Sequence, residues 1–319
     1  MKSKKSKKVV SVVVTGVMIL SLGVVGFSAY KVIPKLMEYK ASDDTFNKMR
    51  DKGVREYEAA DLLSVNNKDV SEEEADDSSK ETPVTNTADI KDALHIDWEA
   101  FTGTEIVAWL QMDAINYPVM QSSDNDKYLH HLPDGSYNYG GTLFLYSHNN
   151  PLFSDQSSFI YGHNMANGSM FGTLKHYAKS DYTNHCFYVY LPDGTRRTYR
   201  FYSIASVKSD SNLYTWAFAS DDSFLEWQTW VKEHSIYPNA PQPSKDAKYV
   251  TLSTCNGYAG TTSRLIVCGQ LETIDTLQEP ASWYSDYIAK YTSATDEKHK
   301  KADEIRTGLE QYLTDQRVS

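Results

Sequence analysis

The chain has 319 residues, of which 40% are hydrophobic and 13% aromatic, enough to bury a sizeable core. Its formal net charge of −10, with no basic stripe beyond the first eight residues, argues against a nucleic-acid partner. Its three cysteines have no zinc-ligand spacing, and an odd number argues against a disulfide framework. We therefore expect no metal, no cofactor and at least one free thiol.

The N-terminus has the pattern of a membrane anchor. Five lysines stand within residues 1–8, a basic tail, and residues 9–30 run for 22 residues without a charge. A helix of that length spans about 33 Å, and lysines before it predict a cytoplasmic N-terminus. A cleaved signal peptide is the alternative, but the run exceeds the usual length of about 7–15 residues. We expect an uncleaved single-pass anchor in the cell membrane, with an extracellular catalytic domain.

Residues 31–89 are polar and rich in charge, and they predict a helical and acidic extracellular linker. Residues 35–63 have a helix-forming composition. Residues 71–81 (SEEEADDSSKE) are acidic and poor in apolar side chains, as in a flexible tether.

Residues 90–275 have the pattern of one β-rich domain. Apolar residues at three- or four-residue spacing predict a helix at residues 89–109. Short apolar or alternating segments predict strands at residues 115–121, 141–146, 158–162, 186–191, 196–207, 248–255 and 264–271. A capped, amphipathic segment predicts a helix at residues 221–234. These elements indicate a β-barrel or sandwich with peripheral helices, followed by a charged, helix-prone extension at residues 276–319.

Cys255 is the strongest candidate for a nucleophile. It ends a predicted strand and enters a loop with two glycines, a position that holds a side chain rigidly but leaves it reachable. A cysteine nucleophile acts as the thiolate and needs a cationic neighbour. Cys186 and Cys268 stand inside strand segments beside large apolar residues, as buried cysteines do. A purely structural Cys255 is the alternative at this point.

A base is required beside such a thiol, and His163 is the first choice among the nine histidines. It follows the strand at residues 158–162 and opens a polar loop, which is again a strand end. His148, in the loop after residues 141–146, is the competing choice. Arg264 begins the strand after Cys255, so a hairpin would place the two residues opposite each other. An arginine there can stabilise a thiolate or the oxyanion of a tetrahedral intermediate, although a surface arginine is the ordinary alternative.

Together these residues resemble the sortase family of membrane-anchored transpeptidases from Gram-positive bacteria. The resemblance covers residues 90–273 and rests on the pentad TLSTC at residues 251–255, Arg264 nine positions later, and Tyr-Gly-His at residues 161–163. The segment YPVMQ at residues 117–121 and the helix at residues 221–234 are most similar to class B. The resemblance implies a closed β-barrel of about eight strands with peripheral helices.

The resemblance also implies roles for individual residues. Cys255 would be the nucleophile, His163 the general acid and base, and Arg264 the stabiliser of the oxyanion. Six further residues would contact the substrate, namely Asn125, Leu129, Ser253, Thr254, Leu213 and Tyr214.

The implied reaction joins secreted proteins that carry a sorting signal to an amine of a peptidoglycan precursor. The enzyme would cleave the signal after a threonine and form a thioacyl intermediate. Three alternatives remain: an extracellular cysteine peptidase that only hydrolyses, a sortase that assembles pili, and a tethered binding module without activity. The sequence shows no lid motif and no second apolar span, which argues against the pilus-assembling class.

Overall fold

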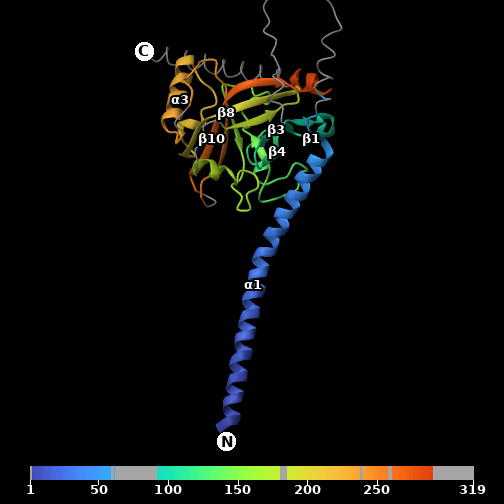
Figure 1. Cartoon of the computed structure of the whole chain (residues 1–319), viewed down its shortest axis with the longest axis vertical. Helices are drawn as coiled ribbons and strands as arrows, with labels where there is room; N and C mark the ends of the chain where they lie inside the picture. Colours follow the sequence, from blue (N-terminus) through green and yellow to red (C-terminus); the bar gives the residue numbers. More distant parts are fainter. Residues whose placement is uncertain are drawn as a thin grey trace, which may run out of the picture.

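The computed structural model describes residues 2–58, 61, 92–179, 185–237, 240–257 and 261–289. Helix α1 (Lys2–Gly53) has 52 residues, and its first part projects away from the rest of the protein (Figure 1). No helix within the described residues is both long and apolar enough to cross a membrane. The span predicted at residues 9–30 falls within α1 and stays a prediction. The predicted tether at residues 71–81 lies outside the described residues.

The last turns of α1 lie against the rest of the fold. Phe46 is 1% exposed, and its ring meets that of Tyr117 edge-on with centroids 5.1 Å apart. Arg50 donates a hydrogen bond of 3.0 Å to the carbonyl of Asn116. The chain then forms β1 (Val54–Glu56), which pairs antiparallel with β2 (Leu94–Ile96).

The centre of the molecule is a closed barrel in the order β10-β8-β7-β3-β4-β5-β6-β9, which confirms the implied eight-stranded barrel. Its strands are β3 (Ile106–Met112), β4 (Ile115–Met120), β5 (Leu143–Leu145), β6 (Ser157–Tyr161), β7 (Cys186–Tyr190), β8 (Thr195–Lys208), β9 (Tyr249–Cys255) and β10 (Ser263–Thr276). Short 3₁₀ helices connect them at η3 (Lys127–Leu129), η4 (Leu174–Lys179) and η5 (Asn212–Tyr214). Two neighbouring pairs are parallel, β4 with β5 and β6 with β9.

The helix predicted over residues 89–109 is wrong. Its described part holds β2, the one-turn 3₁₀ helix η2 (Trp98–Phe101) and the start of β3. Trp98 and Phe101 are both buried, and their three-residue spacing is the period of a 3₁₀ turn. The ring of Phe101 stacks on Trp109 of β3 with centroids 6.0 Å apart. These apolar residues are therefore spaced for burial against the barrel, and their spacing does not mark an α-helix.

Helix α3 (Asp221–Glu233) agrees with the prediction within one residue. Ser220 and Ser223 form a reciprocal capping box at its start, and its buried face carries Phe224, Trp227 and Val231. Of the C-terminal extension, residues 284–289 are helical and residues 290–319 lie outside the described part.

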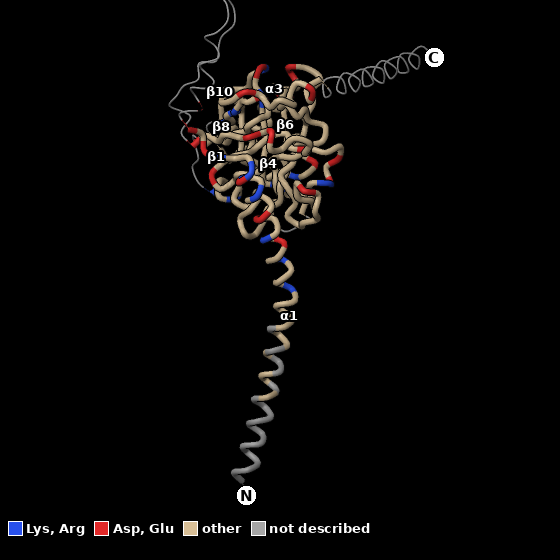
Figure 2. Tube along the Cα trace, turned by 90° about the vertical axis from the view of Figure 1, so that its right-hand side faces the viewer, with Lys and Arg blue, Asp and Glu red and all other residues tan. Residues whose placement is uncertain are grey.

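Three clusters of buried side chains make up the core. The largest fills the barrel, a second joins η2 and β2 to one end of it, and a third lies beneath α3. In the view of Figure 2, lysines, arginines and acidic residues are intermixed over the barrel.

Candidate active site

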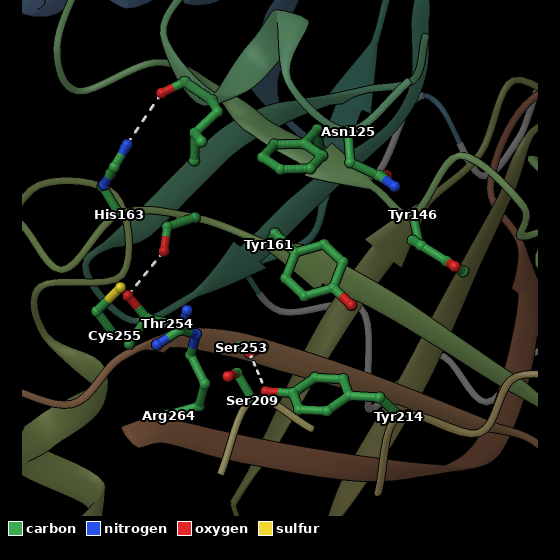
Figure 3. Close-up of a pocket in the computed structure, with 13 residues that line it drawn as sticks. Asn125, Tyr146, Tyr161, His163, Ser209, Tyr214, Ser253, Thr254, Cys255 and Arg264 are labelled. Atoms are coloured by element: carbon green, nitrogen blue, oxygen red, sulfur yellow. Dashed lines mark hydrogen bonds between the residues drawn. The ribbon is translucent and has the colours of Figure 1, made fainter. Parts of the chain in front are cut away.

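A cavity of about 430 Å³ opens where β6, β9 and β10 meet. Eight of the nine residues that the sequence singled out line it, namely Asn125, Leu129, His163, Tyr214, Ser253, Thr254, Cys255 and Arg264. Figure 3 shows the thiol of Cys255, the ring of His163 and the guanidinium of Arg264 around one side of this cavity. The ninth, Leu213, is 1% exposed and is not among the lining residues.

Strand pairing brings these groups together. β9 and β10 form an antiparallel hairpin in which Cys255 pairs directly with Arg264, as the sequence predicts. β6 runs parallel to β9, and Tyr161 pairs with Ser253. His163 is two residues after Tyr161, and Cys255 is two residues after Ser253, the residue with which Tyr161 pairs. Parallel neighbours end at the same edge of a sheet, so imidazole and thiol meet there.

The protonation of His163 is set by its surroundings. Its Nε2–H donates to the carbonyl of Leu129 at 2.9 Å, since a carbonyl can only accept. In the neutral ring the lone pair is therefore on Nδ1. Burial lowers the pKa of His163, the Leu129 hydrogen bond raises it, and the nearby His130 lowers it, with burial the largest cause. The neutral base is thus the favoured resting form.

Two side-chain hydrogen bonds tie the His163 loop to the end of β9. Asn164 donates from Nδ2 to the carbonyl of Cys255 at 2.9 Å, and Thr254 donates from its hydroxyl to the carbonyl of Gly162 at 2.7 Å. Asn164 follows His163 and Thr254 precedes Cys255, so the two bonds hold the backbone of both candidate residues together. Sequence reasoning missed Asn164, whose only signal is its place after His163.

Arg264 is held at the cavity by its own loop. Its Nη1 donates to the carbonyls of Thr261 at 2.6 Å and Ser263 at 3.1 Å. Both acceptors are neutral, so these bonds orient the guanidinium without cancelling its charge. A fixed cation beside a thiol is suited to stabilising negative charge on sulfur or on an oxyanion.

The far wall of the cavity is aromatic. Phe144, Tyr146, Tyr161 and Tyr214 line it, and the hydroxyl groups of Tyr214 and Ser253 are hydrogen-bonded at 2.7 Å. Burial raises the pKa of Tyr161 and of Tyr214, so both phenols stay neutral. Asn125 accepts a hydrogen bond of 2.9 Å from the backbone of Ser147, which fixes the η3 side of the wall.

Sequence reasoning missed part of this lining. Tyr161 stands two residues before His163 on the same strand end, a period-two signal that was available. Tyr146 likewise follows the end of β5. Ser209 has no comparable signal, because the pairing of β8 with the distant strand β10 brings the residue after β8 to the cavity.

The competing residues lie elsewhere. His148 is exposed, stacks on Tyr146 with centroids 5.0 Å apart and does not line the cavity. Cys268 is fully buried in β10, and burial raises its pKa to about 12. Cys186 begins β7, where its thiol donates to the hydroxyl of Tyr188 at 3.3 Å. In the described part of the chain no three His, Cys, Asp or Glu side chains form a metal-binding group.

Known proteins share this architecture. A family model described as the sortase domain matches residues 110–272. Sortase B of Listeria monocytogenes is 31% identical over 173 residues, covering 53% of this chain and 70% of the relative.

Two solved structures share the fold at lower identity. Sortase B from B. anthracis in complex with AAEK1 aligns with a TM-score of 0.54 at 21% identity, covering 74% of this chain and 98% of that chain. The Staphylococcus aureus sortase B–substrate complex aligns with a TM-score of 0.50 at 24% identity, covering 53% and 80%. Because the family match covers just over half of the chain and the Listeria relative is similar over most of its length, the chain belongs to the sortase family of cysteine transpeptidases, and within it to class B.

Proposed function

We propose that this sortase cleaves a sorting signal after a threonine and transfers the acyl group to an amine of a peptidoglycan precursor. One observation carries the proposal: Cys255, His163 and Arg264 come from three strand ends and line a single cavity. The S. aureus sortase B–substrate complex supports the proposal only in that this chain shares its fold.

In the first step the proton of the Cys255 thiol passes to the neutral His163, and the resulting thiolate attacks the carbonyl carbon of the threonine. The carbonyl oxygen gains the negative charge, and Arg264 stabilises it. His163, as imidazolium, gives its proton to the leaving amine as the peptide bond breaks. A thioester to Cys255 and a neutral His163 remain.

In the second step an amine of the acceptor attacks the thioester. His163 takes the proton from this amine, and the thiolate of Cys255 leaves. The new amide bond is then complete, and return of the proton from His163 to the thiolate restores the starting enzyme. Loss of one donor to the oxyanion typically costs about 10²–10³-fold in rate, so Arg264→Ala should cripple turnover in a folded protein.

We propose further that α1 anchors the enzyme in the cell membrane with the barrel outside. The five lysines and the uncharged stretch at residues 9–30 support this orientation. Fractionation of cells that express the full chain tests it, and recovery in the soluble fraction would contradict it.

A panel of pentapeptide sorting signals, read by mass spectrometry with and without an added amine, tests the reaction. We expect a threonine-containing peptide to be cleaved and joined to the amine. Cys255→Ala should abolish cleavage, whereas Cys186→Ala and Cys268→Ala should leave it largely intact. Cleavage by Cys255→Ala would defeat the proposal.

The same assay separates the competing activities. Hydrolysis that is insensitive to added amine would identify a peptidase, and transfer only to a lysine of a pilin-type protein would identify pilus assembly. His163→Ala should be inactive. Activity lost in His148→Ala but kept in His163→Ala would move the base to His148.

A further inference from the structure

The ring of His163 contacts the loop at residues 130–142, between η3 and β5. Tyr139 of this loop stacks on the imidazole with ring centroids 5.5 Å apart and planes inclined by 22°. His130 lies 5.6 Å from the same ring. Neither residue is among those that line the cavity. They contact the proposed acid and base, therefore, without belonging to the substrate surface.

Asn138 fixes the loop that presents Tyr139. Asn138 is 2% exposed, its Nδ2 donates to the carbonyl of Glu38 on α1 at 2.8 Å, and its Oδ1 accepts from the backbone of Gly140 at 2.9 Å. Its own backbone N–H donates to the carbonyl of His130 at 2.9 Å. The loop is thus tied to α1 as well as to itself.

Gly141 closes this loop in a conformation that other residues avoid. Its φ is +53°, and a Cβ at this position would lie 2.3 Å from the carbonyl oxygen of Tyr128. The loop therefore returns tightly onto the end of η3, whose last residue, Leu129, supplies the carbonyl that holds His163. The stack of Tyr139 on His163 and the hydrogen bond of His163 to Leu129 therefore come from one tightly folded segment, η3 with the loop that follows it.

This arrangement restricts the ring in a way that the proposed chemistry needs. A 180° flip of the ring about Cβ–Cγ would put Cε1 in the place of Nε2 and break the Leu129 bond, and Tyr139 on the ring face restricts the tilted orientations through which the flip passes. When His163 carries its proton, the positive charge lies over the π face of Tyr139, an attractive arrangement. The neutral ring and the protonated ring of His163 are therefore held in the same orientation.

We infer that Tyr139 is a positioning residue for His163 and that Asn138 holds it in place by tying its loop to α1. The inference rests on the role of His163 proposed above. It also makes α1 a support of the active site, since the Glu38 carbonyl is one anchor of the loop.

The test compares Tyr139→Leu with Tyr139→Phe in the full chain, using the sorting peptide that the panel selects. Tyr139→Leu should lower kcat about three- to tenfold with KM unchanged, and Tyr139→Phe, which keeps the ring, should restore kcat. Tyr137→Leu is the matched control, because this tyrosine is 67% exposed and its ring meets His130 at a tilt and His131 edge-on. It should have the wild-type kcat.

Three results would overturn the inference: wild-type kcat in Tyr139→Leu, an equal loss in Tyr139→Phe, or a change in KM alone. Asn138→Ala should reproduce the loss of kcat, with thermal unfolding showing that it is folded. A wild-type enzyme that shows no Cys255-dependent cleavage would instead defeat the proposed function.

A second readout needs no turnover. Long-range ¹⁵N–¹H spectra of wild type should show His163 as a single Nε2–H tautomer at neutral pH. Tyr139→Leu should show a mixture of the two tautomers, and Tyr139→Phe should not. A single tautomer in Tyr139→Leu would contradict the positioning role even if the peptide assay failed.

Discussion

Burial and the nearby His130 favour the neutral form of His163. Burial is the largest influence on its pKa and outweighs the opposing hydrogen bond to Leu129. We predict that the ring titrates below 6.5, the value of an unperturbed histidine. Nuclear magnetic resonance of the ring through a pH series measures the midpoint, with His163→Gln to assign the signal. A midpoint above 6.5 would contradict the prediction.

The same shift has a consequence for stability. Between the folded and the unfolded pKa the unfolded chain binds more protons, so acid favours unfolding. The free energy of unfolding of wild type should therefore fall more steeply than that of His163→Gln as the pH drops through about 6.5. Urea titrations of both proteins over a pH series give the two pH dependences. At higher pH, where the ring is neutral in the folded and the unfolded chain, the two should run parallel.

The convergence of the three candidate residues on one cavity was predictable because each stands at or next to an end of a strand. A period-two apolar run stops at a loop, and the residue there is held but accessible, as at Cys255, His163 and Arg264. The residues that support them were not predictable in this way. Asn164 and Tyr139 act across loops far apart in sequence, and no local pattern distinguishes them from surface residues.

At the scale of elements, alternation and turn residues predicted the strands from β4 to β10. The exception is the segment before β3, where buried aromatic residues at three-residue spacing imitate a helix. Spacing alone cannot separate an α-helix from a 3₁₀ turn followed by a strand, since Trp98 and Phe101 are buried in either case. The order of strands around the barrel depends on pairings between distant segments, which periodicity does not give, and the family resemblance supplied the closed barrel of about eight strands without that order.

Helix α3 is joined to β9, the strand that ends at Cys255, by the buried Gln228. Its Oε1 accepts from the hydroxyl of Tyr249 and the backbone of Ser244, each at 2.8 Å, and its Nε2 donates to the Ser244 carbonyl at 2.9 Å. Gln228→Leu removes all three bonds, and the buried hydroxyl of Tyr249 then keeps only its longer bond of 3.5 Å to Gln270. We predict a loss of about 1–3 kcal/mol in the free energy of unfolding, measured in urea.

Glu226→Leu on the exposed face of the same helix is the control for this measurement. It introduces the same side chain and should change the free energy of unfolding by less than about 0.5 kcal/mol. Equal effects of the two substitutions would show that the buried hydrogen bonds contribute nothing.

The whole molecule joins a long helix to a barrel, and the junction is part of the core. Phe46 on α1 is buried with the barrel cluster, so Phe46→Ala opens a cavity between the two. We predict a loss of about 3–5 kcal/mol in a single unfolding transition, because α1 and the barrel should unfold together. Asp44→Ala, at an exposed position two residues earlier on the same helix, should be near neutral. Two separate transitions in wild type would contradict this view.

The parallel pairing of β6 with β9 has a further consequence, for folding kinetics. Ser157 of β6 pairs with Tyr249 of β9, and the whole of β7, β8 and α3 lies between them in the chain. Closing so long a loop is entropically costly and slow compared with forming hairpins. The hairpin of β9 and β10 can bring Cys255 to Arg264 early, but His163 joins them only when the barrel closes. Recovery of enzymatic activity on refolding should therefore follow the slowest structural phase, after most of the strands have formed.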